Sequence, residues 1–156
     1  MPLELQNCTD LPLSPAEAEQ LWEATRTQRG HSDDLVVVRC VTADESAALN
    51  QQYRKKSGPT NILTFSYGNQ PARPAKLDGE AVERSREHDI ALCREVADSE
   101  AISRSTPVRD YYALLLVHAF LHATGLDHEQ SAEEAELTTQ TEQQILTACG
   151  FTAASL

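Results

Sequence analysis

The pattern of apolar and polar positions along this chain predicts a mixture of strands and helices. The run Leu35–Val41 is β-branched and apolar and is bounded by Asp33 and Thr42, which predicts a buried strand. Residues 88–93 have the same character and predict another strand. Residues 2–10 alternate only weakly, as an edge strand does.

Capping sequences mark where helices begin. Ser14-Pro15-Ala16-Glu17 joins a serine cap, a proline at the first helical position and a glutamate that completes a capping box, so it predicts a helix ending before Gly30. Thr42–Glu45 predicts a second helix in the same way. Ser131–Glu134 predicts a final amphipathic helix that ends at Gly150.

The most apolar helix lies late in the chain. Thr106-Pro107 gives its start, with proline again at the first position, and Tyr111–Leu121 is apolar almost all round, so this helix should be buried centrally. A short helix or turn over residues 95–103 precedes it. Strands and helices are mixed without internal repeats, so we expect an α+β fold in which residues 1–156 form a single domain, with a mixed β-sheet of about four strands packed with about five helices.

Three of the five histidines lie at the end of this central helix. His118 and His122 are four positions apart, so both imidazoles point from one helix face. Gly125 can end the helix in the left-handed conformation, after which the chain folds back and His128 can join the other two. Three neutral imidazoles with one open position are the ligand set of a catalytic zinc site, and we expect one Zn2+ per chain.

The spacing H-x3-H-x2-G-x2-H is also that of the metzincin proteases. Those enzymes place a glutamate directly after the first histidine as general base, whereas this chain has Ala119. They also need a methionine turn beneath the metal, and the only methionine here is Met1. Both differences disfavour a metallopeptidase.

The histidine segment resembles the YbeY-type endoribonucleases, the ribosomal RNA maturation factors, whose signature reads H-G-x-L-H-L-x-G-Y-D-H. The chain keeps six of these positions, namely His118, Leu121, His122, Gly125, Asp127 and His128. It departs at Ala119, Ala123 and Leu126, and none of these departures removes a ligand.

Two further blocks extend the resemblance over about residues 35–150. Tyr53-Arg54 followed by Thr60–Phe65 is similar to a Tyr-Arg pair followed by Thr-Asn-Val-Leu-Ser-Phe, and residues 88–93 resemble Gly-Asp-Ile-Val-Leu-Cys with His88 in place of the glycine. The resemblance implies that Arg54 faces the metal cleft and is functionally important. A guanidinium suits a phosphodiester because it donates two parallel hydrogen bonds.

The resemblance implies a zinc-dependent, single-strand-specific endoribonuclease that acts in 16S rRNA 3′-end maturation and ribosome quality control. Its partners would be ribosomal RNA and the ribosome or a ribosomal protein, and its catalytic residues would be Arg54 and His118. The alternative is a non-catalytic ribosome-assembly factor whose metal is structural. The open coordination position favours the enzyme, and the acidic charge favours the alternative.

The general base stays open at this point. It could be the metal hydroxide, the RNA 2′-hydroxyl could be the nucleophile, or Asp127 or Glu129 could assist. Asp127 could instead orient an imidazole. Asp89 has two possible roles: it could hydrogen-bond one of the histidines that bind the metal, or it could hydrogen-bond the backbone at the end of its own strand.

The net charge is −11, from 13 Lys and Arg against 24 Asp and Glu, which counts against tight RNA binding by this protein alone. All the cations lie at or before Arg109, so any basic groove must be built by the first two thirds of the chain and face the metal helix. Its candidates for RNA binding are Lys55, Lys56, Arg73 and Lys76. The last two fall in a predicted loop over residues 68–80 and could instead be solvated.

The cysteines and the N-terminal residues indicate the cellular compartment of the protein. The four cysteines contain no C-x-x-C pair and are interpreted as reduced core thiols rather than disulfides or ligands. No apolar run reaches membrane length, and the N-terminal residues do not form a secretory signal, so we expect a cytoplasmic protein without a membrane partner. His31 is expected to be a solvated loop residue.

Overall fold

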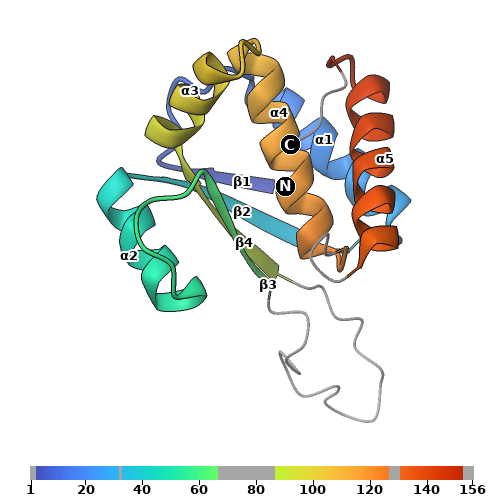
Figure 1. Ribbon diagram of the computed structural model, residues 1–156. Coiled ribbons are helices and arrows are strands. Elements are labelled where there is room, and N and C mark those ends of the chain that lie inside the picture. The colour runs from blue at the N-terminus through green and yellow to red at the C-terminus, as the bar shows by residue number, and fades with distance from the viewer. Residues whose placement is uncertain (1–2, 32, 67–86, 127–130, 153–156) are drawn as a thin grey trace, which may run out of the picture.

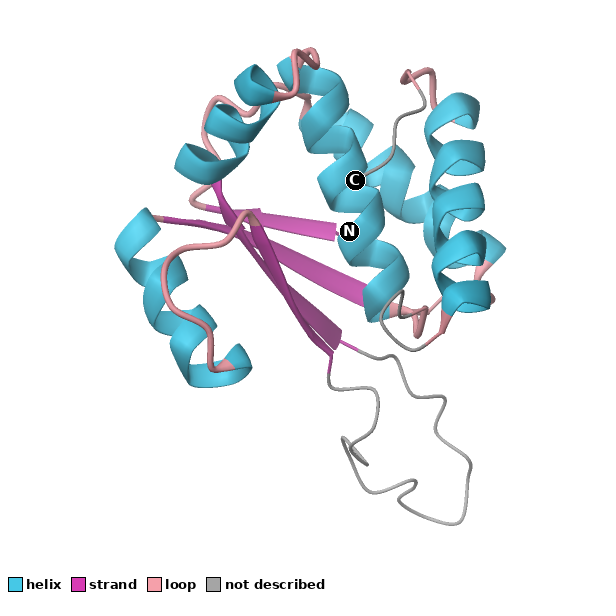
Figure 2. Cartoon of the chain, in the orientation of Figure 1, coloured by secondary structure: helices cyan, strands magenta, loops and turns pink. Residues whose placement is uncertain are grey.

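The structure is a computed structural model that describes residues 3–31, 33–66, 87–126 and 131–152. Its described part contains one four-stranded sheet and five helices (Figure 1; Figure 2), which confirms the predicted α+β fold. In chain order the elements are β1 (Leu3–Gln6), α1 (Pro15–Gln28), β2 (Leu35–Val41), α2 (Ala43–Arg54), β3 (Ile62–Ser66), β4 (Glu87–Cys93), α3 (Arg94–Ser103), α4 (Val108–Ala123) and α5 (Ala132–Ala148).

The sheet is mixed, with strand order β1-β2-β4-β3. β1, β2 and β4 run parallel, and β3 pairs antiparallel with β4, where Thr64 lies opposite Ile90. Because side chains alternate between the two faces of a strand, the register decides which residues meet which helix. Val38, Ile90 and Leu92 pack into the larger core, beneath α1 and α4.

The opposite face of the sheet has a smaller core under α2. Leu63, Ala91 and Cys93 are buried there, and Phe65 packs against them. Figure 1 shows α2 on this side and α1, α4 and α5 on the other. The sheet therefore separates α2 from α4. The edge strand β3 packs on α4, and residues 55–61 connect it to the end of α2.

Capping sequences set the helix ends as predicted. Ser14 and Thr42 both form complete capping boxes, with Glu17 and Glu45 at the third helical positions. One detail differs: Pro107 is the N-cap of α4 rather than its first helical residue. α4 ends at Ala123, and Gly125, two residues further on, has the positive φ (+104°) that was predicted from the sequence.

α4 is the central helix, and its burial fixes the geometry of the site. Every residue from Tyr111 to Leu121 is buried except His118, which is half-buried. Both α1 and α5 pack on α4, and Trp22 of α1 meets Phe120 edge-on with ring centroids 5.1 Å apart. In the described part of the chain, no helix combines the length and the apolar content needed to cross a lipid bilayer.

Two histidines outside the central helix share a buried carboxylate. The Oδ2 atom of Asp34 lies 2.8 Å from Nδ1 of His31 and 2.8 Å from Nε2 of His88. The interpretation of His31 as a merely solvated loop residue was therefore wrong. Because Asp34 and His88 are almost fully buried, this cluster ties the start of β2 to the start of β4.

Candidate active site

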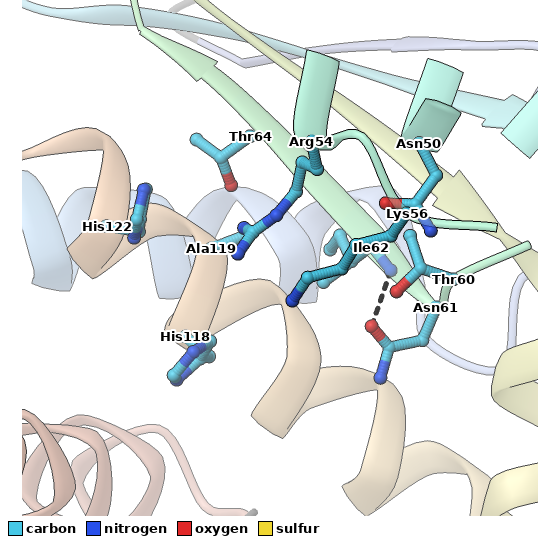
Figure 3. Close-up of a pocket in the computed structure, with 10 residues that line it drawn as sticks. All are labelled: Asn50, Arg54, Lys56, Thr60, Asn61, Ile62, Thr64, His118, Ala119 and His122. Carbon is cyan, nitrogen blue, oxygen red and sulfur yellow. Dashed lines mark hydrogen bonds between the residues drawn. The ribbon is translucent and has the colours of Figure 1, made fainter. Parts of the chain in front are cut away.

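His118 and His122 line one cavity of about 230 Å³ between α4, β3 and the end of α2 (Figure 3). They lie on the same face of α4, as their spacing predicted, and each is half-buried. The packing around α4 holds the helix rigidly, so the two imidazoles have defined positions. The cavity is lined by Asn50, Arg54, Lys56, Thr60, Asn61, Ile62, Thr64, His118, Ala119 and His122.

The wall opposite the histidines is a turn over residues 55–61, held against α2 by side-chain hydrogen bonds. Nδ2 of Asn50 donates to the carbonyl of Gly58 at 2.9 Å. Oγ of Ser46 donates to the carbonyl of Thr60 at 2.9 Å and accepts from its amide at 3.0 Å. Both Ser46 and Asn50 are buried, so the turn is anchored rather than free in solvent.

Arg54 and Lys56 are carried by this anchored segment and are exposed at the cavity. Figure 3 shows both side chains directed from the end of α2 toward the face of α4 that bears the histidines. Of the ten described residues that line the cavity, these two are the cations and none is acidic. Both cations come from the first two thirds of the chain, the only part of the sequence that could supply a basic groove facing α4.

Glu142 on α5 supports His118 from behind, and sequence reasoning missed it. Its Oε2 lies 2.5 Å from Nδ1 of His118, and the residue is 2 % exposed. A carboxylate that accepts the Nδ1 proton leaves Nε2 with the lone pair that a metal needs. The sequence did contain a signal for this role: Glu142 is a charged residue at a helical spacing that places it on the same buried face of α5 as Thr138, Ile145 and Leu146.

Asn61 fixes the start of β3 at the cavity wall. Its Nδ2 donates to Oε1 of Glu100 at 2.9 Å, and the hydroxyl of Tyr111 donates to the same oxygen at 2.8 Å. Burial, and secondly the Glu100 carboxylate, raise the pKa of Tyr111 to about 12, so its hydroxyl keeps its proton at neutral pH. This network joins β3, α3 and α4 at one point.

The other predicted site residues have different placements. Lys55 is the left-handed C-cap of α2, exposed beside the cavity but not one of its lining residues. Asp89 pairs with Phe65 on the face of the sheet that α2 covers, so the structure does not bring it to the histidines. Outside the described residues lie His128, Asp127, Glu129, Arg73 and Lys76.

Within the described residues, no group of three His, Cys, Asp or Glu side chains is arranged to hold a metal ion. The cavity brings together two of the three predicted ligands. Two imidazoles one helical turn apart, one of them hydrogen-bonded to a buried carboxylate, are donors that fit zinc. With two cations opposite, the arrangement suits a metal ion together with a phosphate group.

Comparison with known proteins identifies the family. The family model described as Endoribonuclease YbeY matches residues 11–150. An endoribonuclease YbeY from Methylococcus capsulatus is 35% identical over 149 residues, covering 96% of this chain and 91% of the relative. Another from Paracidovorax citrulli is 40% identical over 119 residues, covering 76% of this chain and 70% of the relative.

A solved structure has the same fold. The solution structure of a Thermotoga maritima protein superposes with a TM-score of 0.58 at 23% identity, covering 94% of this chain and 90% of that one. At this identity the likeness concerns the fold alone. From the family model and the similarity to its relatives along most of the sequence, the chain belongs to the YbeY endoribonuclease family.

Proposed function

We propose that this protein is a zinc-dependent endoribonuclease that cleaves single-stranded RNA. The observation that carries the proposal is the shared cavity of His118, His122 and Arg54, in which two imidazoles and a guanidinium face one another. The names of the relatives, each an endoribonuclease, support RNA as the substrate.

Arg54 binds the scissile phosphate. Its guanidinium donates parallel hydrogen bonds to two phosphate oxygens and stabilises the negative charge that grows on them in the transition state. Lys56, on the same wall, holds a neighbouring phosphate and so sets the register of the strand. Because no acidic residue is among the ten described lining residues, the field in the cavity favours an anion although the whole chain is acidic.

His118, His122 and His128 would hold the zinc ion, the last of them lying outside the described residues. When bound, zinc supplies an activated water and a Lewis acid for the phosphoryl group. Glu142 keeps His118 in the tautomer that offers Nε2. Asp127 and Glu129, also outside the described residues, stay predictions as assisting groups.

Tyr53 supports a preference for unpaired RNA. It precedes Arg54 on α2, is 57% exposed, and rests edge-on against Phe65 with ring centroids 4.8 Å apart. An exposed aromatic ring that is held by a second ring, and that is next in sequence to Arg54, can stack on a base that is not engaged in a duplex. We propose that the nucleotide next to the scissile phosphate stacks on Tyr53.

In the cell we propose that the substrate is ribosomal RNA, at the 16S 3′ end, within ribosome maturation and quality control. The net charge of −11 makes unassisted capture of a long RNA unfavourable, which supports delivery by the ribosome or a ribosomal protein. The same charge favours the second candidate function, a non-catalytic assembly factor with a structural metal.

The test is cleavage of a defined single-stranded RNA by purified protein, compared with Arg54→Ala and His118→Ala variants. We expect each substitution to lower the rate by about 10²–10³-fold, as loss of a transition-state contact or a ligand does. Arg39→Ala is the matched control, because Arg39 is exposed on β2 and its removal changes the net charge equally. Equal cleavage by wild type and both site variants would mean a contaminating nuclease and would overturn the proposal.

A further inference from the structure

Cys8 and Cys40 face each other at the edge of the sheet farthest from β3. Cys40 lies in β2, and Cys8 is two residues after the end of β1, next to Asn7, where the chain turns with a φ of +56°. Sγ of Cys40 donates a hydrogen bond to Sγ of Cys8 over 2.7 Å, and both residues are half-buried. Neither residue lines the cavity of the histidines, so the pair is a separate site.

Arg94 places a positive charge beside this pair. At the start of α3, it donates to the carbonyl oxygens of Thr9 at 2.5 Å and Asp10 at 2.9 Å, which holds the segment after Cys8 in place. Before ionisation, the Cys8 thiol can donate to the carbonyls of Gln6 and Val38 at 3.2 and 3.4 Å. The sulfur is thus fixed on three sides, next to a guanidinium and next to its partner thiol.

The two sulfurs have different acidities. The hydrogen bond from Cys40, and to a smaller degree the charge of Arg94, lower the pKa of the Cys8 thiol. The hydrogen bond that Cys40 donates to Cys8, then burial, and then the charge of the Cys8 sulfur raise the pKa of Cys40. Since Cys8 also accepts the hydrogen bond from Cys40 and lies next to the segment that Arg94 holds, Cys8 is the attacking sulfur, and Cys40 is the thiol that reacts second.

We propose that Cys8 and Cys40 form an oxidisable dithiol site whose reactant is a small disulfide of the glutathione class. The interpretation of all four cysteines as reduced core thiols rather than disulfides would then hold for buried Cys93 but not for this pair under oxidising conditions. The inference is independent of RNA cleavage and goes beyond the proposed function.

The reaction is a thiol–disulfide exchange in two steps. The Cys8 thiolate attacks one sulfur of the small disulfide, whose S–S bond breaks, and the second sulfur leaves as a thiolate. Cys40 then loses its proton and attacks Sγ of Cys8, releasing the other small thiolate. In total, two protein thiols are oxidised to one disulfide, one small disulfide is reduced to two thiols, and the two protons end on the released thiols.

The new bond would close a loop that contains the whole of α1, which packs on α4. A disulfide across a loop of this kind restricts the unfolded chain and so favours the folded state. We expect the melting temperature of the oxidised protein to rise by roughly 5–15 °C.

The experiment incubates the folded, reduced full chain in glutathione buffers of increasing disulfide content and maps thiols by alkylation and mass spectrometry. We expect wild type to lose two hydrogen atoms and to yield a peptide linking Cys8 to Cys40. Cys40→Ser should instead stop as an adduct of one glutathione on Cys8, while Cys8→Ser should stay reduced at Cys40. Cys149→Ser is the control and should behave as wild type.

Two results would overturn the proposal. One is that the native protein forms no link between Cys8 and Cys40 in any buffer, or forms it only after unfolding in denaturant. The other is that Cys40→Ser and wild type give the same adduct, since Cys40 would then play no part in resolving it.

Discussion

The carboxylate of Glu142 on α5 lies 2.5 Å from Nδ1 of His118 on α4. This contact makes the last helix part of the proposed metal site, although α5 contributes no residue to the cavity lining in the described part of the chain. A ligand whose second nitrogen is held by a buried carboxylate cannot rotate or change tautomer without losing that hydrogen bond.

We expect Glu142→Gln to weaken zinc binding by about 10–100-fold, because the glutamine can accept the hydrogen bond but removes the charge that makes the imidazole a stronger donor. The measurement is a competition titration of the protein against a coloured zinc chelator. Glu136→Gln, an exposed substitution on the same helix, is the matched control. Unchanged affinity in Glu142→Gln would limit Glu142 to a packing role.

Arg54→Lys separates charge from geometry at the phosphate site. Lysine keeps the positive charge but cannot donate the two parallel hydrogen bonds of a guanidinium. For Arg54→Lys we therefore expect KM to change little and kcat to fall by at least about 10-fold. Arg54→Ala should raise KM and should lower kcat further. Single-turnover and steady-state cleavage assays measure the difference. If Arg54→Lys cleaved as fast as wild type, Arg54 would act only by attraction.

Removing the metal should abolish cleavage while leaving the fold intact. The core around α4 is made of apolar contacts such as those of Trp22 and Phe120 and does not depend on a ligand at the cavity. Circular dichroism before and after chelation, followed by zinc add-back in the cleavage assay, tests both parts. A chain that unfolds with chelator, and that shows no RNA cleavage when loaded with zinc, would favour the assembly factor with a structural metal.

Tyr53→Leu should weaken binding of single-stranded RNA by about 5–150-fold, because one stacking contact is worth about 1–3 kcal/mol. Tyr53→Phe keeps the ring and should bind as wild type does. Fluorescence anisotropy with a short labelled RNA and metal-free protein measures binding without cleavage. Similar losses in both variants would point to the hydroxyl group rather than to stacking.

Local signals in the sequence were enough to predict most of the elements. The capping boxes at Ser14 and Thr42 depend only on residues three positions apart, so they mark helix starts whatever the tertiary structure. The same holds for His118 and His122, whose shared face follows from helix geometry alone. The two-thirds of the chain that carry all the cations also supply the basic wall of the cavity.

Contacts between distant segments could not be predicted in this way. Glu142 meets His118 only because α5 packs on α4, and nothing near either residue in the sequence fixes that packing. Asp89 was considered as a partner of a ligand, but the pairing of β4 with β3 turns it toward α2, and a shift of one residue would have reversed this. The pairing of Cys8 with Cys40 likewise depends on how β1 lies along β2.

The basic cavity is a small positive region on a strongly negative molecule, and this has a consequence for how salt should act. At 0.1 M salt, charges more than about 10 Å apart are largely screened from each other, so a distant RNA does not feel the cations of the cavity. At lower salt the screening length is greater, and the RNA is repelled by the net negative charge of the whole protein. Most RNA-binding proteins lose affinity steadily as salt is added. Here a moderate rise in ionic strength should first speed the encounter, by weakening the repulsion, before it slows the reaction at higher salt.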